Sequence, residues 1–90
     1  MARIVARFRV FPESIEVDLG ELRNRIETSL PEGSRVEGSG EEPIAFGLKA
    51  LIIGISMPED VEGMMDKVEE ALRGVEGVGE VQILAVTRVR

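Results

Sequence analysis

The side chains in this sequence that could carry out chemistry are mainly carboxylates and guanidinium groups. None of the 90 residues is Cys or His, which excludes a thiol nucleophile, an imidazole base and the usual zinc sites. The adjacent pairs Glu41-Glu42 and Glu69-Glu70 have the chemistry to bind a hard cation, but no segment resembles an EF-hand loop. Solvated carboxylates are the simpler interpretation. We therefore expect no catalytic residue, no metal site and no cofactor, and hence no enzyme.

The glycine-rich segments lack the surroundings that phosphate-binding loops need. The segment Gly38–Gly40 is not followed by Lys-Ser/Thr or by a predicted helix. Gly74, Gly77 and Gly79 follow a predicted helix instead of opening one, which favours a turn over a dinucleotide fingerprint. Neither segment therefore indicates nucleotide binding by this chain itself.

Charge is distributed unevenly along the chain, whose net charge is −6. Residues 2–11 and 81–90 contain arginines and no acid, whereas all 17 acidic residues lie between them. An acidic chain argues against nucleic acid as a direct partner, because phosphate binding needs a basic footprint. No apolar run approaches the ~18 residues of a membrane span. We expect no membrane partner and a cytoplasmic location.

Alternating residues predict a strand at each end of the chain, over residues 2–11 and Val78–Val89. In the first, Ile4, Ala6, Phe8 and Val10 fall on one face and the arginines on the other. If the two strands are neighbours in a sheet, their arginines make one basic stripe; the alternative is solvated strand faces. The stripe would consist of Arg3, Arg7, Arg9, Arg88 and Arg90.

Two helices are predicted between these strands. The first begins after Asp18, an N-cap with Glu21 as its capping-box partner, and ends near Leu30. The second is predicted to begin after Asp60 as its N-cap and to end at Gly74. Its apolar face would consist of Val61, Met64, Met65, Val68 and Leu72.

Two further segments complete the pattern. Residues 34–42 are polar and fit an edge strand or a loop, whereas Leu48–Met57 is apolar enough for a strand covered on both faces. The order β-α-β-β-α-β predicts an α+β fold, the ferredoxin-like α/β sandwich, with a four-stranded antiparallel sheet and two helices on one face. Residues 1–90 would form a single domain in which the first and last strands are neighbours.

One short segment has an unusual composition. Glu42–Leu48 places a single aromatic residue, Phe46, beside small residues at the start of a predicted strand, and Pro43 restricts the chain before it. From the residues alone, Phe46 either covers an edge of the core or is an anchor that docks on another protein.

Five segments match the pattern of one known family. They are Val10–Ser14, Val17–Leu19, Pro31–Gly33, Val75–Val78 and, most specifically, Glu42–Leu51 with its run Pro-Ile-Ala-Phe-Gly-Leu. On these segments, and over essentially its whole length, the chain resembles the archaeal elongation factor 1-beta family. The resemblance implies a guanine-nucleotide exchange factor that acts on the GTPase elongation factor 1-alpha. Such a factor docks on the GTPase and perturbs its magnesium and phosphate site, without covalent chemistry.

The resemblance also implies two groups of partner-binding residues. Phe46 would dock on the GTPase, within a motif that includes Pro43, Ile44 and Gly47. A basic side chain near the C-terminus would approach the magnesium and phosphate site. Eukaryotic relatives have Lys at the position that matches Arg88, and Arg90 follows on the same predicted strand face.

Functions of two other classes stay open from the residues. One is a ferredoxin-like regulatory module that binds a small ligand between two copies. The other is RNA binding on the open sheet face, which the arginines favour and the net charge and scarcity of aromatic residues oppose. Ligand-dependent dimerisation, salt-sensitive RNA binding and co-purification with a translational GTPase distinguish the three.

Overall fold

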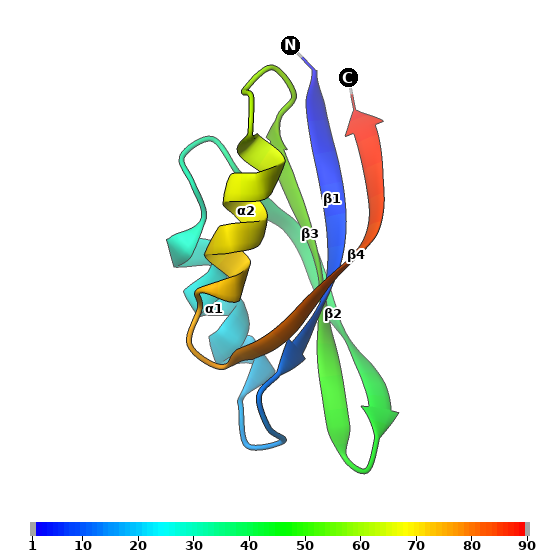
Figure 1. Cartoon of the computed structure of the whole chain (residues 1–90). Coiled ribbons are helices and arrows are strands. Elements are labelled where there is room, and N and C mark those ends of the chain that lie inside the picture. Colours follow the sequence, from blue (N-terminus) through cyan, green and yellow to red (C-terminus); the bar gives the residue numbers. More distant parts are fainter. Residues whose placement is uncertain (1, 90) are drawn as a thin grey trace.

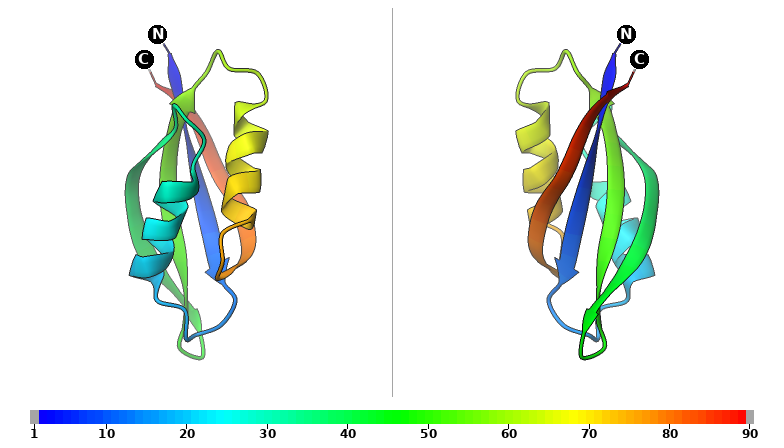
Figure 2. Two further views of the ribbon diagram at one scale, coloured as in Figure 1. Left: turned by 90° about the vertical axis from the view of Figure 1, so that its left-hand side faces the viewer. Right: turned by 90° about the vertical axis from the view of Figure 1, so that its right-hand side faces the viewer.

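The computed structural model describes residues 2–89 and has the predicted order of elements. The strands are β1 (Arg3–Pro12), β2 (Arg35–Ala45), β3 (Leu48–Pro58) and β4 (Val78–Val89). The helices are α1 (Leu19–Ser29) and α2 (Met64–Arg73). All neighbouring strands are antiparallel in the order β2-β3-β1-β4, and both helices cover the same face of the sheet (Figures 1 and 2). The ferredoxin-like prediction is confirmed.

The core lies between the helices and the sheet. Alternate residues of β1 point into it, as the pattern predicts, and Ala6, Phe8 and Val10 are fully buried. The other hydrophobic residues with no exposed surface come from α1, β3 and α2, namely Leu22, Ile26, Ala50, Ile53, Ile55, Met57, Val68 and Leu72. Burial of a Val, Leu, Ile, Phe or Met side chain contributes roughly 1.5–3 kcal/mol relative to leaving it exposed. The sheet that carries the candidate sites is therefore held by the core along most of its length.

Helix α1 begins at the predicted cap. The Oδ1 atom of Asp18 accepts a hydrogen bond from the backbone N–H of Glu21 at 3.0 Å. The capping box is only half formed, because the Glu21 carboxylate instead binds the guanidinium of Arg25 one turn later, at 2.9 Å. The cap thus satisfies one of the free N–H groups at the helix start.

Helix α2 begins three residues later than the predicted cap implies, so the assignment of Asp60 as its N-cap is wrong. Gly63 occupies the N-cap position with a φ of 75°. The N–H of Met64 donates to the carbonyl of Val61 at 3.3 Å, which closes a separate turn before the helix. Asp60 and Val61 lie before this helix, and Val61 is exposed instead of packing in the core. Gly63 permits the left-handed conformation that redirects the chain.

The polar segment after α1 is an edge strand and not a loop. Strand β2 pairs with β3 over most of its length and is exposed at nearly every position. A register irregularity separates the Val36–Ile55 and Gly38–Gly54 pairs. Its polar composition suits an edge strand, because charges on an edge oppose pairing with other chains.

Candidate functional site

A two-residue turn joins β2 to β3 and carries Phe46. Phe46 has a φ of 53° and Gly47 a φ of 80°, between the paired residues Ala45 and Leu48. Hairpin turns with positive φ at both central residues strongly favour Asn-Gly, Asp-Gly or Gly-Gly. A bulky residue at this position is a conformational outlier. Gly47 fits the turn, whereas the Phe46 backbone is strained.

The Phe46 side chain is 100% exposed, so the interpretation that it covers an edge of the core is wrong. Ile44, two residues earlier, is 41% exposed. Pro43 lies on an edge strand opposite Lys49, where the missing N–H is tolerated. The hairpin therefore presents two apolar side chains to the surroundings, and Phe46 contributes nothing to the core.

Arg88 lies near the end of the edge strand β4. It pairs in register with Ile4 of β1, so its side chain is on the helix-covered side of the sheet. Its Nε atom lies 2.6 Å from a carboxylate oxygen of Glu59, and its side chain is 58% exposed. Glu59 directly follows β3, and no sequence pattern indicated this pair. Arg90 lies outside the described residues.

The predicted basic stripe does not form, because Arg88 and the arginines of β1 lie on opposite faces. Residues Phe8–Phe11 pair with β4 in one register, and a bulge at Leu84 shifts the register before Arg7 pairs with Ala85. Without that extra residue Arg88 would lie opposite Arg3. Because side chains alternate along a strand, one inserted residue moves Arg88 to the other face.

The arginines of β1 lie on the open face and differ in their contacts. Arg3 donates to the Gly33 carbonyl at 2.8 Å and to the Ser56 hydroxyl at 2.9 Å. Arg9 binds the Glu42 carboxylate at 2.8 Å and also donates to the Gln82 side chain. Arg7 makes no hydrogen bond or ion pair with the residues that the structure describes. Arg3 and Arg9 thus have partners within the chain, although the buried Nε of Arg3 has none among the described residues.

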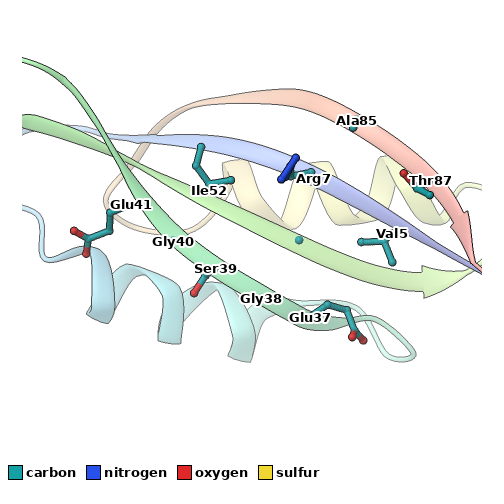
Figure 3. Close-up of a pocket in the computed structure, with 11 residues that line it drawn as sticks. Val5, Arg7, Glu37, Gly38, Ser39, Gly40, Glu41, Ile52, Ala85 and Thr87 are labelled. Atoms are coloured by element: carbon teal, nitrogen blue, oxygen red, sulfur yellow. The ribbon is translucent and has the colours of Figure 1, made fainter.

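A groove of about 520 Å³ crosses the open face (Figure 3). Arg7, Val5 and Ile52 line it together with backbone of Gly38 and Gly40. The groove is large enough for a small ligand. No aromatic side chain lines it, which weighs against the stacking of RNA bases.

One carboxyl group beside this groove has a perturbed pKa. Hydrogen bonds from Arg35 at 2.8 Å and from the Ser56 hydroxyl at 2.9 Å lower the pKa of Glu37 from its ordinary value. Arg3 donates to the same hydroxyl. The charge of Glu37 is therefore compensated within the sheet.

Within residues 2–89, no three acidic side chains gather closely enough to hold a metal ion. Neither helix is long and apolar enough to cross a bilayer.

The two candidate groups lie at opposite ends of the molecule, which is 42 Å long. Arg88 is at the end of the sheet where both chain ends lie, and the Phe46 turn is at the other (Figure 1). The fold therefore does not bring Phe46 and Arg88 together. It holds them apart on one continuous sheet.

The chain is thus a ferredoxin-like α+β domain that presents Phe46 in a strained turn and Arg88 at the far end of the same sheet. The chain belongs to the EF-1 guanine nucleotide exchange domain family, whose model matches residues 5–89. The resemblance found in the sequence is thereby confirmed.

Full-length relatives support the same conclusion. The chain is 48% identical over 86 residues to a Sulfolobus acidocaldarius protein named elongation factor 1-beta, and the match covers 96% of each chain. It is 46% identical over 90 residues to a protein of that name from Aeropyrum pernix, with 100% of each chain covered. A third, from Staphylothermus marinus, is 46% identical over 99% of each chain. Family and relatives support a role in guanine nucleotide exchange during translation elongation.

Proposed function

We propose that this chain, acting as one unit over residues 1–90, promotes exchange of GDP for GTP on elongation factor 1-alpha. Phe46 docks on the GTPase, and Arg88 approaches the magnesium and phosphate site that holds the nucleotide. No bond is made or broken, since the chain changes only how tightly its partner holds a ligand. This mechanism suits a sequence without Cys or His.

The observation that carries the docking step is the conformation and exposure of Phe46. A non-glycine residue in a sparsely populated backbone region costs of order 1–3 kcal/mol, and this side chain, at 100% exposure, gains no burial in return. Burial on a partner gives the side chain a role. Aromatic anchors that enter a pocket often dominate the energy of an interface. Ile44 extends the apolar contact, and Pro43 and Gly47 fix the hairpin that presents it.

The proposed role of Arg88 follows from the chemistry of nucleotide binding. GTPases hold the nucleotide through a phosphate-binding loop and a bridging Mg²⁺. A guanidinium brought to that site competes with Mg²⁺ and weakens nucleotide binding. By linkage, the exchange factor and the nucleotide lower each other's affinity by the same factor. Arg is a planar fork of donors and Lys a compact charge, so Arg88 would contact the phosphate site through several hydrogen bonds.

The distance between the two groups sets a requirement on the partner. The eleven-residue strand β3, which runs from the Phe46 turn to the end of the sheet that carries Arg88, is roughly 35 Å long. Because a stiff sheet links them, docking at the Phe46 end raises the effective concentration of Arg88 at one place on the partner. The GTPase would have to offer an apolar pocket and its nucleotide site at a matching separation.

Release of a fluorescent GDP analogue from elongation factor 1-alpha tests the proposal. With unlabelled nucleotide present in excess, we expect the rate of GDP release to rise with the concentration of the chain. A release rate that does not change with the concentration of the chain would contradict it. Ligand-dependent dimerisation would instead favour the regulatory module with the open-face groove as its site.

A further inference from the structure

We infer that Glu59 holds Arg88 in the free chain and is exchanged for the partner's anionic site when the chain docks. Glu59 is then a positioning residue that acts through Arg88, and it limits the rate at which the chain promotes GDP release. This inference rests on the proposed role of Arg88.

The geometry of the pair supports a specific contact. Glu59 follows Pro58, the last residue of β3, and its backbone N–H donates to the carbonyl of Ala2 at 3.3 Å. Its position beside the end of β4 is thus fixed by the backbone. Its carboxylate lies 2.6 Å from Nε of Arg88. The bulge at Leu84 matters here, because it turns Arg88 to the side of the sheet from which this loop departs.

The neighbouring acids do not share this contact. Asp60 and Glu62 belong to the same loop and are exposed, yet neither forms an ion pair with any residue in the range 2–89. The loop therefore brings one carboxylate, and not a diffuse negative charge, to Arg88. The Glu59 carboxylate offsets the charge of this guanidinium, which opposes its approach to a phosphate or a Mg²⁺ site until the pair opens.

The pair is weak enough to open during docking. Glu59 and Arg88 side chains are 35% and 58% exposed, and exposed ion pairs of this kind change an equilibrium by about two- to fivefold. Releasing Arg88 should therefore increase the rate of GDP release at sub-saturating chain by about two- to fivefold. The increase should shrink as salt rises, because salt screens exposed pairs.

The test compares Glu59→Gln with Glu62→Gln, a matched control that removes the same charge from the same loop without touching Arg88. Both changes are made in the full chain and again in an Arg88→Ala background, and GDP release from elongation factor 1-alpha is measured for all. We expect acceleration by Glu59→Gln, none by Glu62→Gln, and no effect of Glu59→Gln when residue 88 is Ala. Thermal unfolding of each variant identifies any loss of folded chain.

The outcomes separate this inference from the proposed function. If Arg88→Ala impairs exchange but Glu59→Gln behaves like Glu62→Gln, or still acts without Arg88, the role of Glu59 is overturned and that of Arg88 stands. Slower exchange with Glu59→Gln would also overturn the inference. If Arg88→Ala exchanges as fast as the unchanged chain, both roles are overturned.

Discussion

Phe46 and Arg88 carry the proposed function, and both lie outside the packed core. Phe46 is held in a backbone conformation that glycine would adopt without strain, and its ring contacts no core residue. Arg88 forms one exposed ion pair. Residues with so little role in folding can be changed without loss of the fold, so their contributions to binding are open to direct measurement.

Phe46→Ala should weaken binding to elongation factor 1-alpha by about 30-fold, the loss typical of an aromatic anchor. The melting temperature should stay nearly unchanged, because the ring is not buried in the free chain. Titration calorimetry measures the affinity. Phe46→Gly is an informative companion, since it also relieves the backbone strain and should be at least as stable. An unchanged affinity would remove Phe46 from the interface.

At the scale of elements, the sheet and helices follow local sequence patterns. The positions of Phe46 and Arg88 depend on departures from those patterns. The cap at Asp18, the alternation in β1 and the order of elements could be predicted because each follows from neighbouring residues. The start of α2 could not, because Asp60 and Gly63 both suit a cap and the turn closed by Met64 decides between them.

The face of Arg88 could not be predicted either. The bulge at Leu84 adds one residue without a glycine or proline to mark it. That residue moves the side chains of all later β4 positions to the opposite face of the sheet. The pairs Arg9–Glu42 and Arg88–Glu59 join distant segments, and a single sequence does not specify such a register. The motif around Phe46 was visible in the sequence. The exposure of its ring could not be predicted, because it depends on the conformation of the hairpin turn.

Asp18→Ala tests the strongest of the local predictions. Loss of the side-chain cap on Glu21 N–H should destabilise the chain by about 1 kcal/mol, which lowers the melting temperature by roughly 4–8 °C in a domain of this size. Asp18→Ser keeps a capping oxygen and serves as the control. Thermal unfolding followed by circular dichroism measures both. Equal losses in the two variants would show that the cap is not the cause.

At the scale of the whole molecule, one continuous sheet separates the Phe46 turn from Arg88. The network of Arg3, Ser56, Glu37 and Arg35 ties β1, β3 and β2 together across the open face. Its contribution depends on pH, because the folded chain holds the pKa of Glu37 below its ordinary value. The unfolded chain binds a proton at this carboxyl near pH 4.3, about the usual value for Glu.

The stabilisation from Glu37 should therefore be fully present above about pH 4.3 and be lost as the pH falls through the lower pKa of the folded chain. Urea unfolding at neutral pH and at about pH 3 measures this. Glu37→Gln should lower stability at neutral pH and lose less on acidification than the unchanged chain. Glu32→Gln, an exposed site with no ion pair among residues 2–89, is the control. An identical acid response in both variants would contradict the prediction.

We propose that Arg88, at one end of this sheet, weakens nucleotide binding by the GTPase that docks on Phe46 at the other end. The most direct measurement is the rate of fluorescent GDP release from elongation factor 1-alpha, at saturating concentrations of the chain and of its variants Arg88→Ala and Arg88→Lys. We predict faster release with the unchanged chain, a loss of at least about fivefold with Arg88→Ala, and most of the acceleration kept with Arg88→Lys. No acceleration by the unchanged chain, or full acceleration by Arg88→Ala, would contradict it.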